Sequence, residues 1–289
     1  IVVLDKTPFY AESGGQVGDV GSISFDGNEL NVIDVQKQSE MIVHICKGNV
    51  SSWNKASNVI CVVDASHRNN VKRNHTATHL LHASLKVVLG DQVQQAGSLV
   101  HPDYLRFDLT FFEKISKDQI REIEQIVNSQ ILLNSNLHVS VKAYDDAISS
   151  GVVALFGEKY GEQVRVVSTG KFSNELCGGT HVNSTGDIGL FKIVEESSLA
   201  SGVRRIVAVT GEVALKLFQN QSELMLEIQR ILNCNEDELF DRVLQLYEDK
   251  KSLEKKIKLL SRSDESEIAQ WVEDSTKVND HVVVLRKLS

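Results

Sequence analysis

The chain has 289 residues, of which 42% are hydrophobic and 24% charged, and its formal net charge at pH 7 is −8. This length allows one large domain or two to three smaller ones. The composition is that of an ordinary globular protein, and no apolar run approaches the roughly 20 residues that span a bilayer, which argues against a membrane role. The negative charge argues against gripping long nucleic acids through phosphates alone, but leaves open a site for one end of an RNA.

The N-terminus and the cysteines bear on where the protein works. The chain starts IVVLDKTPFY, which contains neither a signal peptide nor a basic leader and lacks methionine, as if it had been cut from a longer protein. The cysteines include no close pair, so we expect free thiols in a reducing compartment and a cytoplasmic location. The four are Cys46, Cys61, Cys177 and Cys234.

Residues 1–64 have the pattern of short strands. Apolar residues alternate in ELNVIDV and MIVHIC, and the stretches DGN at 26–28 and GN at 48–49 are turn signals. We expect a small β-barrel-like or sandwich domain here.

A mixed pattern follows over residues 65–211. One helix is predicted over residues 66–90, and a second over SKDQIREIEQIVNSQILL, where Ser116 and Gln119 have capping-box spacing. LRFDLTF and LHVSVKA alternate as strands do, and VRVVS, IGLFKIV and VRRIVAV are further strand candidates. These elements predict a mixed α+β domain.

The last part of the chain is predicted to be helical. Apolar residues at spacings of 4 and 3 form a heptad seam with one lysine in it, and Asn235 with Glu238 predicts a capping box. The seam consists of Leu239, Val243, Leu246, Lys250, Leu253, Ile257 and Leu260. We expect a helical hairpin over residues 212–260, which packs within the chain or mediates self-association. Residues 261–289 would form a linker and the start of a truncated domain.

Two short motifs have the composition of a zinc site. In HTATH, His75 and His79 are one turn apart on a helix, so both rings project from one face. In ELCGGTH, Cys177 and His181 flank two glycines, which would allow a tight turn that aims both side chains at one point. Imidazole and thiolate together suit tetrahedral zinc, which predicts one site of four ligands. The alternative is a buried free cysteine beside a histidine that satisfies a loop carbonyl.

The residue after the first histidine limits the chemistry of this site. Zinc peptidases with the sequence His-Glu-x-x-His need a glutamate base there, and this chain has Thr76. Four protein ligands are typical of structural zinc. The metal would therefore order a pocket, or one ligand would give way to water or substrate.

Six motifs in order resemble the editing region of alanyl-tRNA synthetases and of the related free-standing alanyl editing proteins. They are TPFYAESGGQVGD, NHTATHLLHASLKVVLG, QQAGSLV, LRFDLT, ELCGGTHV and SGVRRIVAVTG. The resemblance covers roughly residues 1–211. It implies a β-rich subdomain with a glycine-rich element over residues 1–64, a zinc-containing editing core over 65–211 and a helical connector beyond. An aminoacylation domain would precede residue 1.

The resemblance implies an aminoacyl-tRNA deacylase that hydrolyses the ester of alanine tRNA mischarged with serine or glycine. Its partner would be the acceptor end of that tRNA. A pocket built for alanine cannot strongly reject the smaller glycine or a side chain that adds only a hydroxyl, so a second site is needed. Water activated around zinc, helped by the amino group or ribose hydroxyl of the substrate, is the favoured mechanism, because no general base stands out.

Two residues are candidates for a catalytic role beside the metal. Thr78 lies three residues after His75 on the predicted helix, so its hydroxyl can face the pocket, or it can bond back to the Asn74 carbonyl. Gln95 corresponds to a glutamine that the family places in its editing pocket. Its amide could orient water or substrate but cannot act as a base.

Other residues would contact the substrate. Gly14, Gly15 and Gln16 form the glycine-rich element that borders the family's pocket, although a simple tight turn explains the same sequence. Arg204 or Arg205 could hold the phosphates of the CCA end, or could face solvent.

Three rival interpretations remain. The editing domain of threonyl-tRNA synthetases has a similar motif order, but carries arginine and proline where this chain has Gly179 and Thr180. A free-standing editing protein shares the motifs. A zinc-stapled RNA-binding module would have the same ligands without catalysis.

Overall fold

The computed structural model describes residues 1–49, 58–154 and 160–283, with the side chains of 262–267 and 282 left aside. The chain divides into two compact units, Ile1–Phe218 and Gln219–Ser289. Of the helices described, none is long and apolar enough to cross a membrane.

The first strands form a five-stranded antiparallel sheet in the order β1-β4-β3-β2-β5. They are β1 (Val2–Val3), β2 (Gly21–Phe25), β3 (Asn28–Gln38), β4 (Met41–Lys47) and β5 (Ile60–Val63). The expected barrel is wrong: within the described residues β1 and β5 are edges that do not pair, since β1 is only two residues long. Phe9, Ile23, Val32 and Val35 are buried on one face of this sheet, which gives the N-terminal part its own small core.

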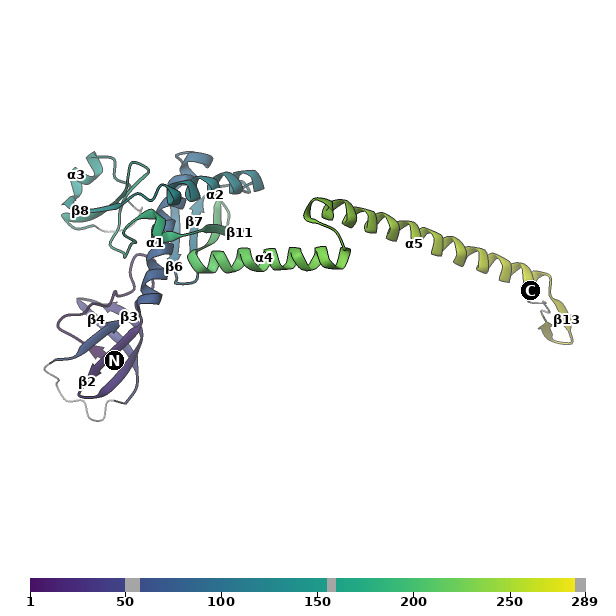
Figure 1. Ribbon diagram of the computed structural model, residues 1–289, viewed down its shortest axis with the longest axis horizontal. Coiled ribbons are helices and arrows are strands. Elements are labelled where there is room, and N and C mark those ends of the chain that lie inside the picture. Colours follow the sequence, from purple (N-terminus) through teal and green to yellow (C-terminus); the bar gives the residue numbers. More distant parts are fainter. Residues whose placement is uncertain (50–57, 155–159, 284–289) are drawn as a thin grey trace. The chain divides into compact units, whose positions relative to one another are not determined.

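Helix α1 (Ala65–Leu89) is the central element of the first unit. The Asp64 side chain caps its start by accepting from the His67 amide, and it ends at Gly90, as predicted. Its inner face packs on helix α2 and on a four-stranded antiparallel sheet of order β11-β12-β7-β6 (Figure 1). These elements are α2 (Lys117–Leu132), β6 (Gln95–Val100), β7 (Leu105–Thr110), β11 (Phe191–Ala200) and β12 (Val203–Thr210).

The predicted periods are found in this core. The Ser116 and Gln119 capping box is present at the start of α2. Leu105, Phe107 and Leu109 are fully buried on one face of β7, as the alternation in LRFDLTF predicted. The residues that sheet and helix bury against each other thus hold α1 firmly in place.

A three-stranded antiparallel sheet, β10-β9-β8, completes the first unit. It contains β8 (Leu137–Ala143), β9 (Gln163–Thr169) and β10 (Ser173–Leu176); helix α3 (Tyr144–Ser149) follows β8, and a short 3₁₀ helix, η1 (Thr185–Ile188), follows β10. The segment in which apolar residues alternate, LHVSVKA, forms the predicted strand β8. Two of its alternating apolar residues, Val139 and Val141, are nevertheless exposed. β10 ends one residue before Cys177, so this sheet delivers the cysteine motif.

The later helices are α4 (Gly211–Leu232), which crosses the boundary between the units, and α5 (Glu236–Glu273). The Asn235 and Glu238 capping box is present. Helix α5 continues past residue 261, where a linker was expected; no glycine or proline after Gly211 would stop the helix. Two short strands follow, β13 (Thr276–Val278) and β14 (His281–Val283).

The predicted seam of α5 is not buried. Val243, Leu253 and Ile257 are 48%, 56% and 62% exposed. Among the described side chains of the second unit, the closed packing expected of a hairpin is therefore absent.

Candidate metal centre and adjoining cavity

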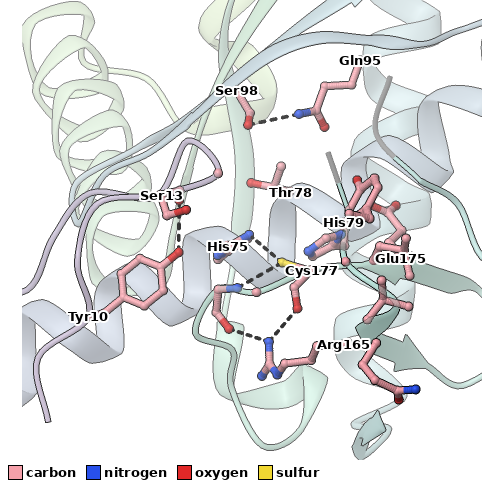
Figure 2. A pocket seen from close by; sticks show the side chains of 18 residues that line it. Tyr10, Ser13, His75, Thr78, His79, Gln95, Ser98, Arg165, Glu175 and Cys177 are labelled. Atoms are coloured by element: carbon pink, nitrogen blue, oxygen red, sulfur yellow. Dashed lines mark hydrogen bonds and ion pairs between the residues drawn. The ribbon is translucent and has the colours of Figure 1, made fainter. Parts of the chain in front are cut away.

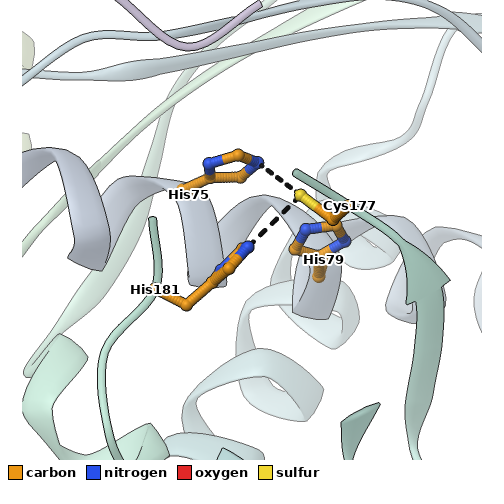
Figure 3. Close-up of side chains that lie close together, drawn as sticks. All are labelled: His75, His79, Cys177 and His181. Atoms are coloured by element: carbon orange, nitrogen blue, oxygen red, sulfur yellow. Dashed lines mark hydrogen bonds between the residues drawn. The ribbon is translucent and has the colours of Figure 1, made fainter. Parts of the chain in front are cut away.

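The four predicted ligands come together in space. Their ligand atoms all lie within 4.8 Å of one another. The Cys177 Sγ is 3.3 Å from His75 Nε2 and 3.2 Å from His181 Nε2, and His79 lies beside them (Figure 3). Tetrahedral zinc with bonds of about 2.0–2.3 Å separates its ligand atoms by roughly 3.3–3.7 Å. The spacing therefore suits one ion.

The two glycines between Cys177 and His181 have different surroundings. A Cβ on Gly179 would overlap the His75 ring, whereas one on Gly178 would meet nothing within 4 Å. Neither glycine has a positive φ. The motif thus needs Gly179 for close approach to α1 rather than for an unusual turn.

Each histidine of the cluster makes a hydrogen bond through Nδ1, the ring nitrogen that is not directed at the cluster. An amide or carboxylate oxygen can only accept, so the rings that contact Gln16 and Glu175 carry their proton on Nδ1. Thr76 donates its own proton to the Lys72 carbonyl, so it accepts from the third ring. The pairs are His75 with Gln16 Oε1 at 2.7 Å, His79 with Glu175 Oε2 at 2.6 Å, and His181 with Thr76 Oγ1 at 3.2 Å. With Nδ1 used in this way, Nε2 is the atom that each ring would offer to a metal.

One atom of the cluster is otherwise unexplained. His79 Nε2 is buried and has no hydrogen-bond partner among the described residues. A buried polar atom without a partner is costly, and a metal ion at this point would satisfy it. The three nitrogens and one sulfur are a donor set that zinc favours.

The charges of the cluster suit a divalent cation. Burial by itself disfavours a charged Cys177, yet His75 and His79 hold the pKa of this thiol well below 9.0. Burial also opposes a charged Glu175, but the His79 ring keeps the pKa of this carboxyl below 4.5. Burial and the nearby His75 lower the pKa of His181 to about 3. Cys177 and Glu175 are thus held as anions beside a neutral His181. Burial opposes a charged His79, but Glu175 and Cys177 raise the pKa of this ring well above 6.5, so a metal at Nε2 would take the place of a proton.

A cavity of about 280 Å³ opens beside the cluster (Figure 2). It is lined from four directions: the N-terminal loop, α1, β6 and the sheet that carries Cys177. Its lining includes Tyr10, Ser13, Gly14, His75, Thr78, His79, Gln95, Ser98, Tyr160, Arg165, Glu175 and Cys177. Hydroxyl, amide and guanidinium groups lie among apolar surface in this lining, so the cavity suits a small ligand that carries both polar and apolar groups.

The predicted catalytic residues Thr78 and Gln95 line this cavity. Thr78 donates its hydroxyl proton to the Asn74 carbonyl at 2.8 Å, so the pocket and backbone interpretations both hold and its oxygen remains an acceptor. Gln95 Nε2 donates to Ser98 Oγ at 3.1 Å (Figure 2). Both side chains are thus held in place.

The glycine-rich element is divided in its role. Gly14 lines the cavity, whereas a Cβ on Gly15 would lie 2.6 Å from the Ser98 carbonyl oxygen, so this glycine permits close contact with β6. Gln16 is fully buried, and its amide also contacts Thr180. Gln16 therefore lies behind His75 and is not among the residues that line the cavity.

The two predicted phosphate-binding arginines lie outside the cavity lining. Arg204 is engaged with Glu196, and Arg205 makes two hydrogen bonds to Asp108, at 2.7 and 2.9 Å. Both guanidinium groups are thereby used within the sheet.

Three residues of the site were missed by sequence reasoning. Glu175 accepts from both His79 and His82, and its place on β10, two residues before Cys177, was an available signal. Arg165 and Tyr10 also line the cavity. They come from other segments, and no local pattern marks them.

The first unit is a mixed α+β domain in which a pair of histidines on a helix meets a Cys-x-x-x-His loop. Family models match two segments of this unit. Residues 164–207 match the family described as the threonyl and alanyl tRNA synthetase second additional domain. Residues 1–67 match the class II (A) tRNA synthetases. Two separate segments of the chain therefore match families of aminoacyl-tRNA synthetase domains.

Whole-chain comparison decides between threonyl and alanyl synthetases. The chain is 50% identical to the alanine–tRNA ligase of Thermotoga petrophila, over 96% of the chain and 32% of the relative. It is 49% identical to that of Hydrogenovibrio crunogenus over 90% of the chain and 30% of the relative, and 46% identical to that of Pseudoalteromonas translucida over the same shares. These matches confirm the resemblance to alanyl-tRNA synthetases: the chain corresponds to a segment of that family, about a third of its relatives' length.

Proposed function

We propose that this segment is the editing region of an alanine–tRNA ligase. It would bind zinc through His75, His79, Cys177 and His181, and would hydrolyse the ester of alanine tRNA mischarged with serine or glycine. The observation that carries the proposal is a cavity with hydroxyl, amide and guanidinium side chains beside a donor set of three nitrogens and one sulfur. The alanine tRNA acceptor end would be its partner and the cytoplasm its compartment.

Two parts of the chain build this site together. We assign residues 1–64 to a β-rich subdomain and 65–211 to the editing core. Contact between Gln16 and His75 supports their joint action, since the glycine-rich loop braces a ligand on α1. Residues 212–289 would connect this region to a further domain.

Thr78 is the residue proposed to recognise serine. Because its O–H donates a hydrogen bond to the Asn74 carbonyl, its oxygen can accept a hydrogen bond from a substrate hydroxyl. Alanine offers no such donor, so the correct product forgoes this bond. The serine ester thereby gains binding energy that the alanine ester cannot.

The chain's own groups would position the ester and its attacking water. Zinc, when bound, supplies Lewis-acid polarisation or an activated water. Gln95 orients water or ester oxygen through its amide, which Ser98 holds. Glu175 is already committed to His79 and His82, so we assign it no proton transfer. The substrate's amino group or ribose hydroxyl would assist.

The decisive experiment compares release of labelled amino acid from Ser-tRNA(Ala) and Ala-tRNA(Ala). The wild-type chain should release serine much faster than alanine, and Gln95→Ala should abolish this while zinc content and circular dichroism stay unchanged. A folded, zinc-loaded chain that releases neither amino acid would favour the non-catalytic RNA-binding module.

A further inference from the structure

Arg165 lies between the cavity and the cysteine motif. It stands on β9, lines the cavity, and its Nη1 donates to the carbonyls of Cys177 and Gly179, both at 2.8 Å (Figure 2). The guanidinium is therefore attached to the backbone of one metal ligand.

Most of the hydrogen-bonding capacity of Arg165 is unused. A guanidinium has five N–H donors, and the two carbonyls take those of Nη1. Nε and Nη2 have no partner among the described residues, and no described carboxylate pairs with this arginine. Arg68, Arg204 and Arg205, by contrast, each pair with a carboxylate. Arg165 is thus a half-buried cation with donors to spare.

The position of Arg165 favours an anion as ligand. It lines the cavity and has no carboxylate partner among the described residues, so its charge is available to a group bound there. The planar fork of arginine matches the geometry of phosphate, to which it can donate two parallel hydrogen bonds.

We propose that Arg165 binds the phosphodiester that precedes the esterified terminal nucleoside of the RNA. This inference rests on the proposed function. In such a substrate the ester and this phosphate are separated by one ribose. Arg165 contacts the backbone of Cys177, so an ester beside the metal places that phosphate near the guanidinium. Tyr10 and Tyr160 line the same cavity, and one face of Tyr160 is stacked on Tyr144, so the adenine would stack on the other face or on Tyr10.

Binding of two hydrolysis-resistant ligands tests the assignment without relying on catalysis. Both carry serine in amide linkage on the 3′ position of adenosine, and one has a 5′-methyl phosphate in addition. By calorimetry the zinc-loaded wild-type chain should bind the phosphate-bearing ligand at least about tenfold more tightly, as expected for a charge-assisted pair. Arg165→Gln removes the charge but keeps a donor for the loop carbonyls, and should abolish the difference.

The matched control is Arg121→Gln, since Arg121 is an exposed arginine on α2 outside the cavity lining. It should preserve the difference between the two ligands. Zinc content and circular dichroism are recorded for all three proteins.

Other outcomes overturn the assignment. Equal wild-type affinities for the two ligands would show that no phosphate is recognised. A difference that persists in Arg165→Gln would place the phosphate elsewhere. Loss of zinc from Arg165→Gln together with equal weakening for both ligands would make Arg165 only an anchor of the loop. Failure of the hydrolysis assay, with the binding difference intact, would refute the editing proposal but not the phosphate contact.

Discussion

The two compact units use the same kind of sequence pattern in different ways. In Ile1–Phe218, periodic apolar residues meet other elements, and Phe107 is fully buried. In Gln219–Ser289 the helical period is equally regular, yet Leu253 is 56% exposed. Periodicity thus predicts an element and its apolar face, but burial depends on a second surface, which only the first unit provides among its described residues.

The largest expected effect comes from removing a ligand of the proposed metal. Cys177→Ala deletes the only sulfur of the ligand set. Loss of a residue that hydrogen-bonds to a metal ligand typically costs ~10–100-fold in metal affinity, and loss of this direct ligand should cost more. Because the cluster ties α1 to the loop after β10, the first unit should also melt at a lower temperature. Metal content after dialysis against a chelator, and thermal denaturation, measure the two effects.

Cys234→Ala is the matched control for that prediction, since Cys234 lies in the second unit. Metal content and melting of the first unit should stay unchanged. Full metal retention by Cys177→Ala would remove this residue from the ligand set.

A pair of truncations compares the cores of the two units directly. Phe107→Ala should cost about 3–5 kcal/mol, because it leaves a cavity between α1 and the sheet. Leu253→Ala, at an exposed position, should change stability by less than about 0.5 kcal/mol. Urea unfolding followed by hydrogen exchange of peptides from each unit measures both. A large cost for Leu253→Ala would mean that α5 is covered in solution.

Residues that hydrogen-bond to the proposed histidine ligands, without being ligands themselves, provide a finer test within the first unit. Glu175→Gln keeps an oxygen that accepts from His79 but removes the negative charge. Metal affinity should fall about 10–100-fold, measured by competition with a chromogenic chelator. Glu162→Gln, an exposed neighbour at the start of β9, should leave affinity unchanged. Equal affinities for both variants would show that hydrogen bonding alone, and not charge, matters at Glu175.

Local patterns were sufficient to predict some of this architecture. Helix α1 with its stop, the cap of α2 and the strand at residues 105–110 follow from short-range period and capping. The four metal-site candidates follow from two spacings of four residues. In each case the information lies within one or two turns of chain.

What could not be predicted depends on distant contacts. Gln16 meets His75 across 59 residues, and Glu175 meets His79 across 96. The open edges of the N-terminal sheet depend on the length of β1. Arg204 and Arg205 were predicted to hold phosphates, because charge alone does not reveal which arginines already have carboxylate partners.

The smallest expected effect lies at the start of α5. Asn235 accepts from the Glu238 amide at 3.0 Å, and the Glu238 side chain returns to the Asn235 amide. Asn235→Ala removes the first of these bonds and should cost about 1 kcal/mol of local helix stability. Since few other contacts restrain this exposed helix, the cost should appear as faster hydrogen exchange confined to its first turns, with metal content and ligand binding unchanged. Unchanged exchange there would mean that the N-terminal end of α5 is held by packing rather than by its cap. That result would weaken the contrast between the two units.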